Sequence, residues 1–105
     1  MFSIGQAMTL RPGGYAEYKR YHNEIWPDLA AIMSDNEVSI AIFLLGNRLV
    51  LHAVAPTKAH WDRSNNNATL EKWQAVMTRF LETDQSGKSI VDTLEPAFVF
   101  GMFKG

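Results

Sequence analysis

Two apolar segments separated by only two residues constrain the fold of this chain more than any other feature. Residues 38–45 (VSIAIFLL) and 48–55 (RLVLHAVA) each have the length and apolar character of a strand. Gly46-Asn47, which separates them, is typical of the tight turn of a β-hairpin. Pro56 should end the second strand, because it cannot donate to a sheet hydrogen bond. The sequence therefore predicts an antiparallel hairpin over residues 38–55.

Further elements are expected on both sides of this hairpin. Residues 2–10 show the two-residue period of a strand, and the turn signal Arg11-Pro12-Gly13-Gly14 follows. Pro27 should separate two helices, because it disrupts a helix interior but suits the first position of a new helix. The expected helices, the third of them capped by Thr57, span residues 15–25, 27–34, 58–63 and 68–81, and a final strand is expected over 97–103 (AFVFGMF).

This β-α-β-β-α-β order predicts a ferredoxin-like α+β sandwich, in which helices cover one face of a four-stranded antiparallel sheet. A chain of 105 residues has the size of one domain, so a single domain is expected over 1–105. The hairpin and the segment 97–103 hold more apolar side chains than one helix layer can bury. We therefore expect a homodimer that packs sheet to sheet in a barrel-like association.

Composition and charge exclude several classes of partner and site. Ten basic and eleven acidic residues give a net charge of −1, whereas nucleic-acid binding needs a basic surface. There is no cysteine, and His22, His52 and His60 lack the short spacing of metal ligands. No segment approaches the ~20 apolar residues of a membrane span, and the first residues do not have the pattern of a signal peptide. We expect a cytoplasmic protein that binds neither nucleic acid, nor membrane, nor metal.

Residues 18–28 (YKRYHNEIWPD) hold the side chains best suited to chemistry. Tyr18, His22 and Trp26 recur at intervals of four, which places them along one edge of a helix if the helix extends that far. The histidine pKa of ~6.5 allows His22 to act as a general acid or base near neutral pH. Tryptophan rings suit the apolar face of a sugar. The same residues are also compatible with ordinary helix packing, with His22 at a helix end.

The run 18–29 (YKRYHNEIWPDL), with its Tyr-x3-His-x3-Trp-Pro pattern, resembles the signature of the L-rhamnose mutarotase family. Residues 39–44 and 71–77 resemble the second strand and the last helix of the same family, so the resemblance covers essentially the whole chain. It implies a dimeric ferredoxin-like protein that interconverts the α and β anomers of a six-carbon deoxy sugar. It further implies that His22 is the proton donor and that Tyr18 and Trp73 bind the sugar.

Two positions depart from the family pattern. Ile40 stands where the family carries a tyrosine on its second strand, and Gln74 follows Trp73 where the family carries a second tryptophan. We therefore expect a sugar mutarotase acting on L-rhamnose or a related deoxyhexose such as L-fucose. His22 should protonate the ring oxygen while Tyr18 or a water handles the anomeric hydroxyl, a reaction that requires no cofactor. The expected substrate-binding residues are Tyr18, Trp26, Ile40, Trp73 and Gln74.

Two other functions remain open at the level of the sequence. Small dimeric ferredoxin-like proteins also host cofactor-free monooxygenase or cyclase chemistry, and fold analogy does not separate these activities. A non-catalytic sugar-binding module could retain the same motif for packing alone.

Overall fold

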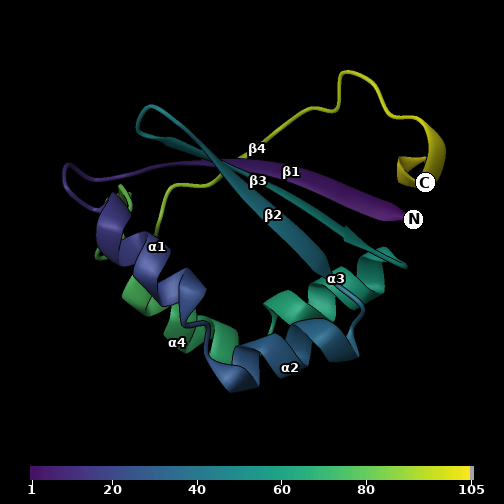
Figure 1. Cartoon of the computed structure of the whole chain (residues 1–105), viewed down its shortest axis with the longest axis horizontal. Helices are drawn as coiled ribbons and strands as arrows, with labels where there is room; N and C mark the ends of the chain where they lie inside the picture. The colour runs from purple at the N-terminus through teal and green to yellow at the C-terminus, as the bar shows by residue number, and fades with distance from the viewer. Residues whose placement is uncertain (105) are drawn as a thin grey trace.

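A four-stranded antiparallel sheet carries all the α-helices of residues 1–104, the part of the chain that the computed structural model describes, on one of its faces (Figure 1). The strands lie in the order β2-β3-β1-β4, which is the arrangement of the expected ferredoxin-like sandwich, so this prediction is confirmed. The strands are β1 (Phe2–Thr9), β2 (Ser39–Leu45), β3 (Arg48–Ala55) and β4 (Asp92–Thr93). The helices are α1 (Tyr15–Asn23), α2 (Pro27–Asp35), α3 (Lys58–Asn65), α4 (Ala68–Met77) and the short 3-10 helix η1 (Gly101–Phe103).

The predicted hairpin is confirmed, and its register fixes which side chains face the helices. Leu49 in β3 lies opposite Met8 of β1 and Leu44 of β2, and all positions that alternate with these point to the helix side. Gly46 in the turn has a φ of 63°, a conformation that glycine adopts without strain. The three long strands thus present one largely apolar face to the helices.

The junction between α1 and α2 differs from the expected one. α1 ends at Asn23 rather than Ile25, and Pro27 is the first residue of α2, as predicted. Trp26 precedes Pro27 with φ −59° and ψ 130°, the extended conformation that a following proline favours. Trp26 therefore lies outside the helix that carries Tyr18 and His22.

α4 ends at Met77, so the expected helix over 68–81 is too long. Beyond Met77 the chain turns to pair with the end of β1: the Arg11 amide donates to the Phe80 carbonyl at 2.8 Å, and the Glu82 amide donates to the Thr9 carbonyl at 2.8 Å. These backbone hydrogen bonds replace those that a longer helix would have made. The apolar Phe80 and Leu81 remain buried, which explains why they continued the helical pattern of the sequence.

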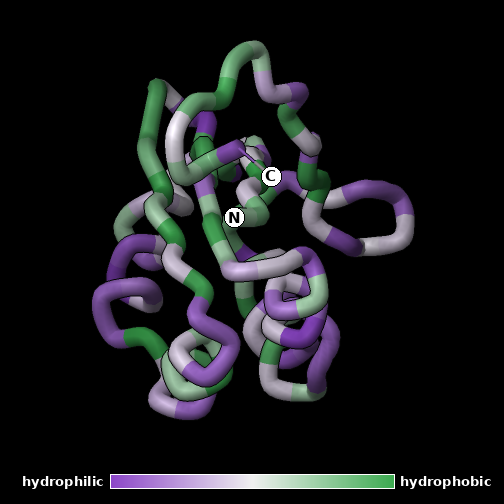
Figure 2. The backbone as a smooth tube through the Cα atoms, turned by 90° about the vertical axis from the view of Figure 1, so that its right-hand side faces the viewer, coloured by the Kyte–Doolittle hydropathy of each residue, from purple (hydrophilic) through white to green (hydrophobic). Residues whose placement is uncertain are grey.

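The predicted strand over 97–103 is wrong. The fourth strand is Asp92–Thr93, which pairs with Gln6 and Ala7, and Pro96 has no amide hydrogen with which to extend the ladder. The chain then crosses the sheet face that lies away from the helices (Figure 1). The centroids of the Phe103 and His52 rings lie 5.2 Å apart, and the Met1 ammonium donates to the Lys104 carbonyl at 3.2 Å. The two ends of the described chain therefore lie close together (Figure 2).

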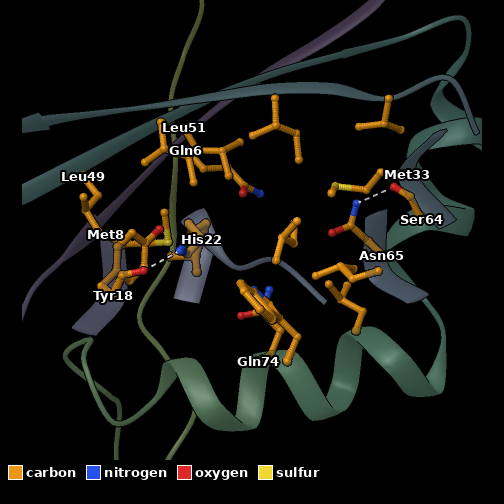
Figure 3. A pocket seen from close by; sticks show the side chains of 18 of the residues that line it. Gln6, Met8, Tyr18, His22, Met33, Leu49, Leu51, Ser64, Asn65 and Gln74 are labelled. Carbon is orange, nitrogen blue, oxygen red and sulfur yellow. Dashed lines mark hydrogen bonds between the residues drawn. The ribbon is translucent and has the colours of Figure 1, made fainter. Parts of the chain in front are cut away.

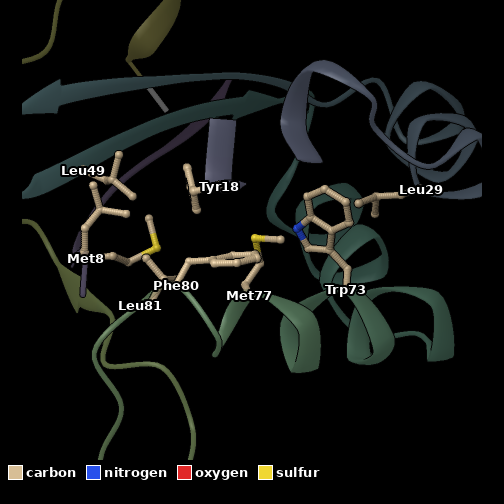
Figure 4. Close-up of a cluster of buried hydrophobic side chains, with 9 residues drawn as sticks. Met8, Tyr18, Leu29, Leu49, Trp73, Met77, Phe80 and Leu81 are labelled. Atoms are coloured by element: carbon tan, nitrogen blue, oxygen red, sulfur yellow. The ribbon is translucent and has the colours of Figure 1, made fainter. Parts of the chain in front are cut away.

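The hydrophobic core fills the space between the sheet and the helices (Figure 4). It contains the buried side chains Met8, Leu10, Tyr18, Leu29, Leu49, Trp73, Met77, Phe80 and Leu81. Among residues 1–104, no helix has the length and apolar character needed to cross a membrane. The core packs α1 and α4 together, and it thereby fixes the positions of Tyr18 and Trp73.

Candidate active site

A cavity of about 460 Å³ opens between the helix-facing side of the sheet and the helices (Figure 3). Tyr18 and His22 enter it from α1, and Trp73 and Gln74 enter it from α4. Ile40 lines it from β2. The structure therefore brings together five of the six site residues expected from the sequence, and Trp26 is the exception.

His22 is held by a hydrogen bond to its own helix. Its Nδ1 lies 2.8 Å from the Tyr18 carbonyl oxygen, one turn earlier. A carbonyl only accepts, so this contact assigns the hydrogen of the neutral imidazole to Nδ1 and leaves the lone pair on Nε2. Burial lowers the pKa of His22 from its ordinary value of 6.5, and the backbone hydrogen bond opposes that shift in part. At neutral pH the ring is uncharged, and its free nitrogen can accept a proton.

Tyr18 provides a hydroxyl that stays protonated. Its side chain is buried, and its ring centroid lies 4.2 Å from that of His22. Burial raises the pKa of the Tyr18 phenol to about 12. Within residues 1–104 this hydroxyl makes no hydrogen bond to another residue, so it is available as a donor or an acceptor. The cavity thus combines a neutral imidazole and a neutral phenol at one end.

Trp73 supports His22 from α4. Its ring meets the His22 ring edge to face, with centroids 5.1 Å apart and planes at 80°. The Trp26 ring packs edge to face on the Trp73 ring in the same way, with centroids 5.1 Å apart and planes at 88°. Trp26 does not line the cavity, so its contact with the site passes through Trp73. The structure places Trp26 as a support of Trp73 and not beside the cavity.

The sheet wall of the cavity is apolar with one polar exception. Ile40, Ile42 and Leu44 come from β2, and Leu49 and Leu51 come from β3. Gln6 of β1 enters the cavity between them, and Ser64 with Asn65 closes the end opposite Tyr18 and His22 (Figure 3). Gln6, Ser64 and Asn65 are not among the site residues expected from the sequence. The signal for Gln6 was a polar residue inside the apolar alternation Phe2, Ile4, Met8.

Carboxylates do not gather at this site. Within the described residues, no group of three or more histidine or acidic side chains could hold a metal ion. Arg20 on the outer face of α1 pairs with Glu17 at 2.7 Å and with Glu24 at 3.1 Å. The ionisable groups at the cavity are therefore His22 and Tyr18, with Tyr15 and Lys19 further along its lining.

Comparisons with known proteins agree on one family. The family model for L-rhamnose mutarotase matches residues 3–100. An L-rhamnose mutarotase of Brucella anthropi is 32% identical over 94 residues, which cover 87% of this chain and 89% of that protein.

Solved structures agree on the fold. The crystal structure of an L-rhamnose mutarotase from Formosa agariphila superposes with a TM-score of 0.79 at 24% identity, covering 96% of this chain and 100% of the other. A dimeric ferredoxin-like protein from an uncultured marine organism superposes with a TM-score of 0.63 at 12% identity, covering 97% and 98%. Since the family model spans nearly the whole chain, this protein belongs to the L-rhamnose mutarotase family, a family of isomerases that act on carbohydrates.

Proposed function

We propose that this protein interconverts the α and β anomers of L-rhamnose or a related deoxyhexose such as L-fucose, with His22 transferring the proton. The observation that carries the proposal is the state of His22: a neutral imidazole whose Nδ1 is bound to a carbonyl and whose Nε2 is free at the cavity. The names of the curated relatives support the reaction class and the rhamnose end of this range.

The charge states of His22 and Tyr18 support an order of proton transfers in which the two residues exchange the roles expected from the sequence: the imidazole accepts the anomeric proton and the phenol protonates the ring oxygen. Neutral His22 takes the proton of the anomeric hydroxyl at Nε2, the bond between C1 and the ring oxygen breaks, and its electron pair goes to the ring oxygen. That oxygen takes a proton from the Tyr18 hydroxyl, which the raised pKa keeps protonated. Rotation about C1–C2 turns the aldehyde over, and the reverse transfers close the ring as the other anomer. His22 is then the proton donor of the closing step.

Acid-base catalysis of this kind contributes roughly 10²–10⁴-fold, which suffices for a reaction that already proceeds in water. It consumes no proton and no electron overall, because each group recovers its starting state. The chain needs only to hold the sugar with its anomeric end beside Tyr18 and His22.

Replacement of His22 tests the assignment. His22→Asn should slow catalysed anomer exchange by about 10²-fold or more while the protein stays folded. Saturation transfer between anomeric protons, with L-rhamnose, L-fucose and D-sugars as the panel, measures the exchange after subtraction of the spontaneous rate. His52→Asn is the matched control, because His52 is exposed on the opposite face of the sheet and should leave the rate unchanged. Undiminished exchange in His22→Asn would contradict the role of His22.

The same sugar panel separates the other functions. Sugar binding without accelerated exchange would favour a non-catalytic module. A protein that interacts with no sugar would favour the cofactor-free monooxygenase or cyclase, since the sheet wall of the cavity is mostly apolar.

We also infer that two copies pack through the sheet face that lies away from the helices. Phe43 and Leu45 of β2 lie on that face and are 64% and 78% exposed. Phe98, Phe100 and Met102, in the segment between β4 and the C-terminal end that crosses this face, are also more than half exposed. Large apolar patches on a protein surface mark interaction sites. The structural neighbour described as a dimeric ferredoxin-like protein supports a second copy as the occupant of this face.

A further inference from the structure

Gln6 interrupts an otherwise apolar surface. The helix-facing positions of β1, β2 and β3 carry Phe, Ile, Met, Leu or Ala at every residue except this one. Gln6 is half-buried and lies opposite Leu51 in the sheet register. A polar group at such a position costs free energy relative to an apolar side chain unless something binds it.

No residue of the described chain binds the Gln6 carboxamide. Within residues 1–104 it makes no hydrogen bond to another residue, although it reaches into the cavity. Figure 3 shows the Gln6 carboxamide pointing from the sheet into the space between the His22 end and the Asn65 end. Its one donor group and one acceptor are therefore directed at whatever occupies the cavity.

Asn65 presents a fixed acceptor to the same space. Its Nδ2 donates to the Trp61 carbonyl at 2.9 Å and to Ser64 Oγ at 3.3 Å. Ser64 is buried, and its hydroxyl donates to the same carbonyl at 2.8 Å. Since a carbonyl only accepts, these contacts identify the nitrogen end of the Asn65 amide and leave Oδ1 free. Figure 3 shows this oxygen facing the cavity.

We propose that Gln6 and Asn65 form a second hydroxyl-binding subsite, opposite Tyr18 and His22, and that Gln6 thereby selects the aldose by a hydroxyl far from its anomeric carbon. The inference rests on the proposed function, which places C1 of the sugar beside His22. The hydroxyls on C3 and C4 then lie across the ring, on the side of Gln6 and Asn65. A sugar hydroxyl can accept a hydrogen bond from the Gln6 amide group and donate one to the Asn65 amide oxygen at the same time. A methyl group or a hydrogen atom in its place can do neither.

The test pairs a substitution in the protein with a deletion in the sugar. Gln6→Met keeps the length of the side chain and removes its polar atoms. For the aldose that the protein converts fastest, Gln6→Met should lower kcat/KM about 10-fold or more, the scale of one lost hydrogen bond in a dry site. For the deoxy analogue that lacks the hydroxyl bound by Gln6, the kcat/KM values of Gln6→Met and of the unmodified protein should differ by less than about 2-fold.

Two controls separate binding from folding. Gln85→Met changes an exposed glutamine outside the cavity and should leave every sugar unaffected. The Tm of Gln6→Met should be equal to or higher than that of the unmodified protein, because the apolar side chain suits its neighbours. Gln6→Leu, which matches Leu51 opposite, provides a second apolar variant. An equal loss on the parent sugar and on all its deoxy analogues, no loss at all, or a lowered Tm in both variants would overturn the proposal.

The side-chain amide signals of Gln6 in ¹H–¹⁵N spectra test the subsite independently of turnover. They should shift when the preferred aldose is added and stay in place with the analogue that lacks the hydroxyl. A shift of the Gln6 signals without accelerated anomer exchange would support the subsite and contradict the proposed catalysis. Accelerated exchange without a shift would support the catalysis and contradict the subsite.

Discussion

His22 owes its chemical state to the Tyr18 carbonyl on its own helix and to its burial. The Tyr18 carbonyl takes the hydrogen of Nδ1, and burial disfavours the imidazolium, so the pKa lies below 6.5. The activity should therefore rise with pH through that lowered pKa, as His22 loses its proton, and should then stay level at neutral and mildly alkaline pH. The Tyr18 phenol, with a pKa of about 12, does not limit this range. Catalysed exchange measured against pH, with the spontaneous rate subtracted, checks this profile, and an activity that falls as the pH rises toward neutrality would contradict it.

Single residues of the site were predictable where a regular element set their spacing. Tyr18 and His22 stand four apart on one helix, so the sequence places them on one edge, and the structure keeps them adjacent. Trp26 was misplaced because α1 ends before it. Gln6 and Asn65 were not predicted, because they reach the cavity that contains His22 only through the packing of β1 and α3 around it. No local pattern in a sequence encodes such a meeting of distant elements.

At the scale of elements, periodicity and proline positions predicted the hairpin and three of the helices closely. The predicted end of α4 and the predicted last strand were wrong for the same reason. Phe80 and Leu81 are buried by the end of β1, and residues 97–103 lie across the sheet instead of joining it. An apolar pattern in a sequence indicates that the side chains are buried against an apolar surface. It does not determine which backbone conformation buries them.

The junction between α3 and α4 depends on one asparagine. Asn67 Oδ1 accepts the Leu70 amide at 2.8 Å and so caps α4, while its Nδ2 donates to the carbonyls of Arg63 and Ser64 at the end of α3. Asn67→Ala should lower the free energy of unfolding by about 1–2 kcal/mol, because both helix ends lose partners. Urea unfolding at an unchanged m-value measures the loss. Asn66→Ala is the matched control: that side chain donates to the exposed Asp62 carbonyl only, so an equal effect of both substitutions would refute the capping role.

At the scale of the whole molecule, the two faces of the sheet differ in what covers them. The helix side holds the core and the cavity, with His22, Tyr18, Gln6 and Asn65 around one space. The other side is covered only in part by the segment that runs from β4 to η1. The proposed site is built within one copy, whereas the proposed dimer forms through the second face. Loss of the pairing should therefore affect stability and solubility before it affects the arrangement of His22 and Tyr18.

The pairing is tested by placing charge on that second face. Phe43→Glu combined with Leu45→Glu puts two carboxylates where the second copy would bury apolar side chains, at a desolvation cost that separates the copies. Analytical ultracentrifugation should give twice the 11.8 kDa chain mass for the unmodified protein and the single-chain mass for the double variant. Ala59→Glu adds a charge at an exposed position of α3, on the helix side, and should leave the dimer intact. If Ala59→Glu alone dissociated the dimer, the interface would have to lie on the helices instead. If the unmodified protein sedimented with the mass of a single chain, the proposal of a dimer would be wrong.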